Sequence, residues 1–151
     1  MTFASAHLGN IEVDESSAIE FPRGLPGFEE RHRFLLMQHP ANEGLVFLQS
    51  LETPDLCFLA LPARSIRGDY QLAIPDEDLE VLGYPHGHCP EIGKDVIALA
   101  VLSLVEGEAP TANLLSPVII RSHTRRAVQA IRTDDRYRCR EPLVVEEAVC
   151  S

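Results

Sequence analysis

The stretch GLVFLQSLETPDLCFLALP, residues 44–62, gives the clearest indication of the fold. Two short apolar runs, Gly44–Leu51 and Leu56–Pro62, lie on either side of ETPD, whose proline and aspartate are typical of turns. Each run is rich in aromatic and branched side chains and has the length of a single strand. The stretch therefore predicts two strands joined by a tight turn.

Further apolar runs of strand length lie on both sides of this pair. The longest, Asp95–Val105, alternates too little for a half-exposed strand, so we expect much of it to be buried on both faces. Roughly eight to ten short strands separated by turns favour a mainly β, single-domain antiparallel β-barrel-like fold, whose closure also protects strand edges. The other expected strands are a hairpin over Ala6–Val13 about Gly9 and Asn10, then Ile19–Phe21, Arg33–Gln38, Asp69–Ile74, Leu114–Ile120 and Val128–Arg132.

One segment, PDEDLEVLG (Pro75–Gly83), predicts a short helix near residues 76–82. Pro75 precedes the first turn, and three acidic residues follow it near the positive end of the helix dipole. Leu79 and Leu82 share one face, and Gly83 is a natural helix end. Because the helix has two turns at most, it requires packing against the rest of the protein.

The composition is that of an ordinary globular protein. With 151 residues, 45% hydrophobic and 24% charged, we treat residues 1–151 as a single domain. No apolar run approaches the roughly 20 residues of a membrane helix, and the N-terminus lacks the basic and apolar regions of a signal peptide. We therefore expect a cytoplasmic protein that makes no membrane contact, with its four cysteines reduced.

The net charge of -10 is unevenly distributed. Residues 1–120 carry 18 acidic and 6 basic side chains, whereas residues 121–140 carry seven arginines and two aspartates. An acidic body repels nucleic acid and attracts basic partners. The arginine segment is either the solvated face of a hairpin or a nucleic-acid-binding stripe; the first interpretation is favoured, so we expect no direct nucleic-acid binding.

A search for catalytic chemistry finds isolated candidates only. His86, His88 and Cys89 lie in HGHCP and are the weak candidates for metal ligands, but zinc sites normally use four ligands from two separated clusters. The sequence contains no nucleophile motif, zinc-protease motif or phosphate-binding glycine loop. We therefore expect no enzyme activity, cofactor or metal. The alternative is a small β-barrel metal-dependent protein or enzyme that uses this loop.

Four segments, taken in their order and spacing, resemble the FliW family of flagellar assembly factors. The resemblance covers about residues 9–143 and leaves a C-terminal tail, residues 144–151. Later residues also match, among them Gln129, Asp134 and Tyr137. The four segments are FPRGLPGF (Phe21–Phe28), FLQSLETPDLCF (Phe47–Phe58), PDEDLEVLG (Pro75–Gly83) and TANLLSPVII (Thr111–Ile120).

Two residues depart from the family pattern, both in the late hairpin. Arg121 stands where the family usually has asparagine, and Ala127 where it usually has glycine.

The resemblance implies a cytoplasmic binding protein. Proteins of this family bind the translational repressor CsrA and antagonise its repression of flagellin mRNA. They also bind flagellin as a chaperone-like partner, and the two partners compete. An acidic chain is consistent with a basic, RNA-binding partner.

Six residues are candidates for binding a partner protein. The acidic helix (Asp76, Glu77, Asp78 and Glu80) is the candidate surface for a basic partner. Gln49 and Asn113, which lie inside family motifs, are either structural hydrogen-bonding residues or part of a partner surface. Five apolar residues are expected in the core: Phe28, Leu36, Phe47, Leu59 and Val101.

Overall fold

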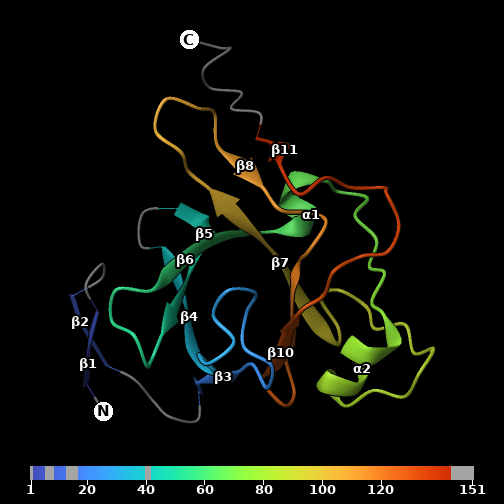
Figure 1. The fold of residues 1–151 in the computed structure, drawn as a ribbon, viewed down its shortest axis with the longest axis horizontal. Helices are drawn as coiled ribbons and strands as arrows, with labels where there is room; N and C mark the ends of the chain where they lie inside the picture. The colour runs from blue at the N-terminus through green and yellow to red at the C-terminus, as the bar shows by residue number, and fades with distance from the viewer. Residues whose placement is uncertain (1, 6–8, 13–16, 40–41, 144–151) are drawn as a thin grey trace.

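The computed structural model describes residues 2–5, 9–12, 17–39 and 42–143. Within this part of the chain, seven strands form a closed barrel in which every pairing is antiparallel except β10 with β3. The predicted mainly β, barrel-like fold is confirmed (Figure 1). In spatial order the barrel strands are β7 (Val96–Ser103), β6 (Cys57–Pro62), β5 (Asn42–Ser50), β4 (Arg33–His39), β3 (Ile19–Glu20), β10 (Arg126–Gln129) and β9 (Val118–Arg121).

Strand β7 closes the barrel. Its first half, Val96–Leu99, pairs with β9, and Leu99–Val101 pairs with β6 on the other side. Its end extends past the barrel and pairs with β8 (Thr111–Ala112), which in turn pairs with β11 (Glu141–Pro142). The expectation of a long, largely buried strand is confirmed, although Ile97 is 37% exposed.

In the described residues, two helices lie outside the barrel wall (Figure 1). Helix α2 (Asp76–Leu82) has the predicted bounds and ends at Gly83, whose φ of 84° suits a residue without Cβ. Helix α1 (Ala63–Ile66) follows β6 directly and was not expected. No helix in the described residues is long and apolar enough to cross a membrane.

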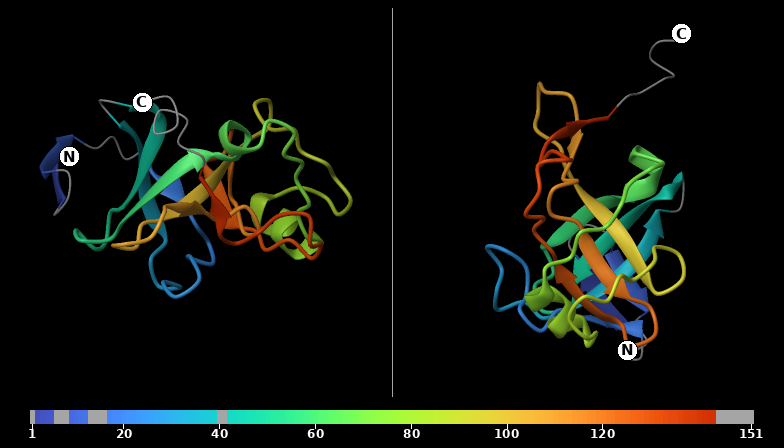
Figure 2. Two further views of the ribbon diagram at one scale, coloured as in Figure 1. Left: turned by 90° about the horizontal axis from the view of Figure 1, so that it is seen from above. Right: turned by 90° about the vertical axis from the view of Figure 1, so that its right-hand side faces the viewer.

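The N-terminal hairpin consists of β1 (Thr2–Ser5) and β2 (Gly9–Glu12). Gly9 is the first residue of β2 and pairs with Ser5, so the prediction of a turn at Gly9 and Asn10 was wrong. The residues that connect the two strands, 6–8, lie outside the described part of the chain. Figure 2 places this hairpin at one end of the long axis of the molecule and α2 at the other.

The segment Asp69–Ile74 is not a strand, contrary to the prediction. Tyr70 is fully buried and donates its hydroxyl hydrogen to the carbonyl oxygen of Leu114 at 2.8 Å. The Tyr137 hydroxyl accepts a hydrogen bond from the N–H of Gln71 at 3.2 Å. Side-chain hydrogen bonds therefore take the place of a sheet pairing in this segment.

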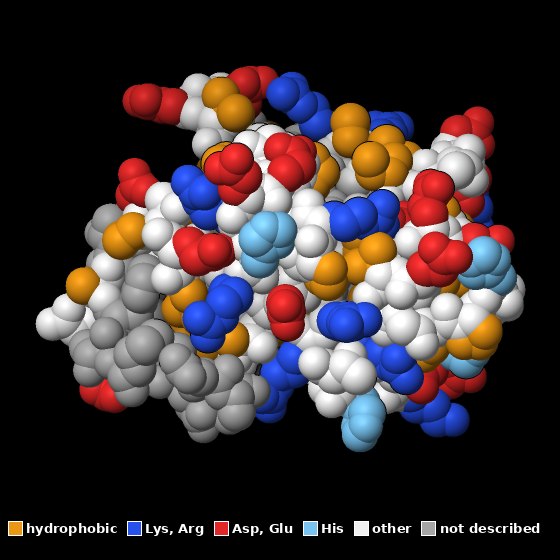
Figure 3. Space-filling model, turned by 60° about the horizontal axis from the view of Figure 1, so that its bottom comes forward, with side chains coloured by type: hydrophobic (Ala, Val, Ile, Leu, Met, Phe, Trp, Pro, Cys, Tyr) orange, Lys and Arg blue, Asp and Glu red, His pale blue; other side chains and the backbone are white. Residues whose placement is uncertain are grey.

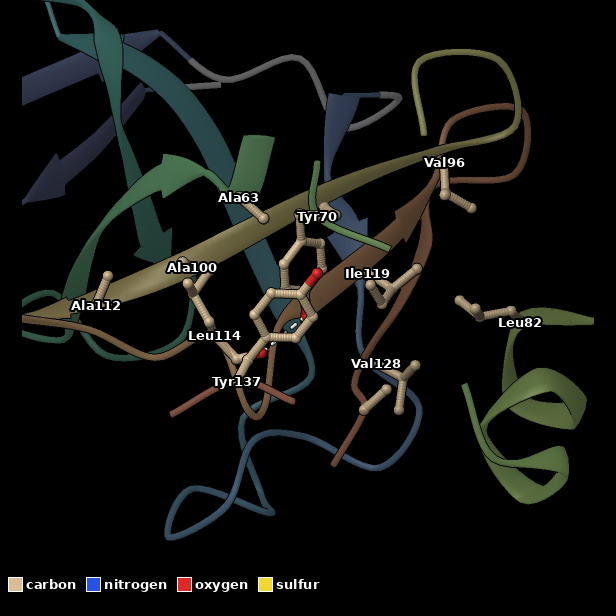
Figure 4. Close-up of a cluster of buried hydrophobic side chains, with 12 residues drawn as sticks. Ala63, Tyr70, Leu82, Val96, Ala100, Ala112, Leu114, Ile119, Val128 and Tyr137 are labelled. Carbon is tan, nitrogen blue, oxygen red and sulfur yellow. Dashed lines mark hydrogen bonds between the residues drawn. The ribbon is translucent and has the colours of Figure 1, made fainter. Parts of the chain in front are cut away.

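The two tyrosine rings form the centre of one of the two core clusters. Their centroids lie 4.4 Å apart, and Figure 4 shows the rings side by side among aliphatic side chains. The guanidinium of Arg132 lies 4.7 Å from the centre of the Tyr137 ring, and the Arg132 side chain is only 1% exposed. Arg132 also donates to the carbonyl oxygen of Gln71 and, through two hydrogen bonds of 2.8 and 2.9 Å, to the carboxylate of Asp134.

The second cluster fills the other part of the barrel around Phe21, Phe34 and Leu48. Of the five residues expected in the core, Leu36 and Val101 are half-buried and pack against this cluster, whereas Phe47 and Leu59 are half-buried as a cross-strand pair. Phe28 is 40% exposed, so its assignment to the core was wrong.

Replacing Arg132 with alanine is expected to lower the free energy of unfolding by about 3 kcal/mol, because the Gln71 carbonyl and both tyrosine rings lose a buried partner. Urea unfolding at pH 7 measures this loss. Arg136→Ala is the matched control: Arg136 contacts the Tyr137 ring and the Gln71 side chain but is exposed, so it should cost less than about 1 kcal/mol. Equal losses in the two variants would contradict the structural role of Arg132.

Candidate protein-binding surface

The turn FPRGLPGF is held at its first residue by Phe21 and at its last by the contact of Phe28 with Phe58. Phe21 is fully buried, packs edge-on against Phe34 at 5.2 Å, and donates its N–H to the carbonyl oxygen of His32. Gly24 has a φ of 65°, and a Cβ there would lie 2.6 Å from the carbonyl oxygen of Glu29. The turn therefore requires glycine at position 24 for conformation and for space.

Arg23 joins this turn to helix α2 through an ion pair with Asp78, 55 residues away in sequence. Asp78 is only 7% exposed, and burial raises the pKa of its carboxyl group while the Arg23 charge opposes that rise. A buried carboxylate without its partner is strongly unfavourable. The pair therefore holds the turn and the helix in contact.

A groove of about 270 Å³ lies where the turn, helix α2 and strand β10 meet. We call it the acidic groove. Glu29 and Glu77 lie on its walls, and Ile131, 54% exposed, adds apolar surface. The carboxylate of Glu29 accepts the N–H of Gly27 at 2.9 Å, and this hydrogen bond lowers the pKa of Glu29. The groove is lined by Arg23, Gly24, Pro26, Glu29, Glu77, Asp78, Val128, Gln129 and Ile131.

The four predicted acidic residues of helix α2 fall into two groups. Asp76, Glu77 and Glu80 are exposed, whereas Asp78 faces inward to Arg23. Asp76 accepts the N–H of Gly87 at 3.2 Å, and Glu80 lies 2.5 Å from His86. The surface in Figure 3 shows acidic and basic side chains interspersed, with apolar patches between them. The surface available to a partner therefore excludes Asp78.

The structure gives Gln49 and Asn113 hydrogen bonds that stabilise turns. Gln49 is fully buried, and its amide nitrogen donates to backbone carbonyl oxygens between Ser50 and Leu56, the closest at 2.9 Å. Asn113 is half-buried and accepts the N–H of Ser116 at 2.9 Å. Gln49 therefore has the hydrogen bonds that a structural residue needs, while Asn113 retains an accessible side.

The HGHCP loop does not bring its three candidate ligands together. His86 contacts Glu80, the His88 ring stacks on Tyr84 at 4.5 Å, and the Cys89 thiol lies 3.8 Å from the carbonyl oxygen of Gly87. In the part of the chain that the structure describes, no group of three His, Cys, Asp or Glu side chains could hold a metal ion. His88 and Cys89 do line a cavity of about 560 Å³ between residues 71–76 and 87–92.

Several arginines of the segment 121–140 have structural partners. Arg121 donates to the carbonyl oxygen of Leu82 at 2.9 Å, at the C-terminus of helix α2, and its guanidinium lies 4.1 Å from the centre of the Tyr84 ring. A cation at this end of a helix is favourable. With Arg132 buried and Arg121 bound to the end of helix α2, the segment is not a simple solvated face. Sequence reasoning missed both roles, because neither has a local signal.

The fold and this surface define a small closed β-barrel with a fixed turn and an acidic helix at one end. A family model described as "FliW protein" matches residues 2–143. The chain therefore belongs to the FliW family.

Relatives of known name agree with this assignment. The chain is 32% identical over 149 residues to the flagellar assembly factor FliW of Clostridium botulinum (strain Langeland / NCTC 10281 / Type F), covering 98% of this chain and 100% of that protein. It is 34% identical to that of Treponema pallidum (strain Nichols), covering 98% and 95%. A crystal structure of the flagellar assembly factor FliW superposes with a TM-score of 0.81 at 31% identity, covering 97% of this chain and 99% of that one.

Gly24→Ala is expected to destabilise the protein by about 2 kcal/mol, because alanine is strained at positive φ and its Cβ meets the Glu29 backbone. Gly27→Ala is the control, because Gly27 also has a positive φ, 85°, but a Cβ there would meet nothing within 4 Å. This variant is therefore expected to lose only about 1 kcal/mol of unfolding free energy. Thermal unfolding of both variants gives the comparison. Identical losses would show that the close approach at Gly24 is unimportant.

Proposed function

We propose that this protein acts in the cytoplasm as a flagellar assembly factor that binds the translational repressor CsrA and antagonises its repression of flagellin mRNA. It also binds flagellin as a chaperone-like partner, and it has no enzymatic activity. Membership of the FliW family supports this role, since the relatives named above are flagellar assembly factors.

The observation that carries the proposal is the set of exposed carboxylates on helix α2 beside the apolar surface of Ile131. A repressor that binds RNA presents basic side chains, and these are attracted by carboxylates exposed around a small apolar area. Glu77 lines the acidic groove and is exposed, while Glu80 and Asp76 lie on the adjoining face of the same helix. The chain as a whole carries -10, which adds a long-range attraction.

Asp78 takes no direct part in this interaction. Its carboxylate is occupied by Arg23 and is nearly inaccessible. Reversal of Asp76, Glu77 and Asp78 together to lysine would therefore combine a change of surface charge with a broken buried pair. A clean test has to change exposed carboxylates only.

The double variant Glu77→Lys/Glu80→Lys is expected to stay folded and to bind the CsrA of the same organism at least about tenfold more weakly at low salt. Isothermal titration calorimetry measures the affinity. Glu106→Lys/Glu108→Lys makes the same change of net charge at exposed positions between β7 and β8, so it is the matched control. The difference between the two variants should shrink at high salt.

Two results would contradict the proposal. Equal affinities of the two double variants would remove the surface at helix α2 as the CsrA site. Absence of binding to CsrA, and to flagellin, by the folded unmodified protein would remove the proposed function itself.

A further inference from the structure

A second groove, of about 390 Å³, lies between the turn FPRGLPGF and strands β7 and β8. We call it the apolar groove. Leu25 and Pro26 of the turn line it, so the turn separates it from the acidic groove, with which it shares Pro26 and Gln129. Its volume lies within the roughly 300–1,000 Å³ typical of ligand pockets. The remaining lining residues are Phe58, Val101, Leu102, Ser103, Asn113, Cys139 and Arg140.

One exposed apolar side chain packs on the lining of this groove, and two more follow the lining in sequence. Phe28 is 40% exposed and packs edge-on against Phe58, a lining residue, at 5.7 Å. Leu104 and Val105, 60% and 47% exposed, follow the lining residue Ser103 directly. These are three of the five large hydrophobic side chains exposed in the described residues. Phe28 therefore extends the apolar lining of the groove, and contiguous exposed apolar surface marks an interaction site.

Two amide side chains give the groove a polar pair of fixed orientation. The side-chain oxygen of Asn113 accepts the N–H of Ser116, and the side-chain nitrogen of Gln129 donates to the carbonyl oxygen of Ser116, both at 2.9 Å. These contacts leave the NH₂ group of Asn113 as a donor and the side-chain oxygen of Gln129 as an acceptor. One donor and one acceptor match the C=O and N–H of a peptide backbone. An extended segment offers such groups, whereas the interior of a helix does not.

The charge of the groove differs from that of its neighbour. Among the described residues that line it, Arg140 is the one charged side chain, and it is exposed. A basic segment would find no carboxylate among the lining residues of the apolar groove. The acidic groove, in contrast, offers it Glu29 and Glu77.

We infer that the apolar groove binds an extended, apolar peptide segment of a partner, with the Asn113 and Gln129 amides pairing with its backbone and Arg140 with a carboxylate on it. This inference rests on the proposed function: of the two partners, flagellin supplies the segment, because the repressor is expected to be basic. CsrA and flagellin would then contact opposite sides of the FPRGLPGF turn.

The test is titration of the full-length protein with flagellin and, separately, with CsrA. Ser103→Trp fills the groove from an exposed position, and Arg140→Glu reverses its charge; each should weaken flagellin binding about tenfold or more and leave CsrA binding within about twofold. Ser122→Trp and Arg138→Glu are the matched controls, since both are exposed and neither lines the groove. Circular dichroism and thermal unfolding establish that all four variants fold.

Loss of flagellin binding in Ser103→Trp and Arg140→Glu, but not in the controls, supports the inference. Unchanged flagellin binding in folded Ser103→Trp overturns it and leaves the proposed function intact. Equal loss in a groove variant and its matched control also overturns it. If the unmodified protein binds no flagellin, the flagellin part of the proposed function fails, and this inference fails with it.

Discussion

The ion pair between Arg23 and Asp78 is the contact on which the arrangement of the candidate surface depends. The two residues belong to segments far apart in the sequence, the turn after β3 and helix α2. Asp78 is almost fully buried, and a carboxylate in that position needs a paired cation. With Arg23 in place, the turn packs beside the helix, and the space between them becomes the acidic groove. The other side of the same turn forms a wall of the apolar groove.

The closed barrel supplies the rigid frame for this contact. Strand β7 joins β6 to β9, so the turn and the late hairpin are anchored to one continuous sheet. Helix α2 is too short to be stable alone. It is fixed near its N-terminal end through Asp78 and at its C-terminus through Arg121, which donates to the Leu82 carbonyl. Arg121 is one of the two departures from the family pattern, and here it has a clear structural role.

Local signals in the sequence predicted most of the fold. Pro75, the acidic first turn and Gly83 predicted helix α2, and short apolar runs between turns predicted most strands of the barrel, although β9 and β10 begin and end at other residues than expected. The errors arose where tertiary contacts decide. Tyr70 is drawn into the core by its hydrogen bond to Leu114, so its segment is not a strand, and Phe28 packs on Phe58 at the surface. The partner of a buried arginine such as Arg132 has no local signature either.

The candidate surface was predicted less completely than the fold. Sequence alone gave the acidic residues of helix α2 but could not separate inward-facing Asp78 from exposed Glu77, because both belong to one acidic run. Sequence reasoning also did not place the FPRGLPGF turn beside the helix. A double-mutant cycle on Arg23→Ala and Asp78→Ala, with unfolding free energy and CsrA affinity as readouts, tests this arrangement most directly. The account predicts a coupling of about 2 kcal/mol in stability and weaker CsrA binding in each folded single variant. Additive losses in stability with unchanged affinity would contradict it.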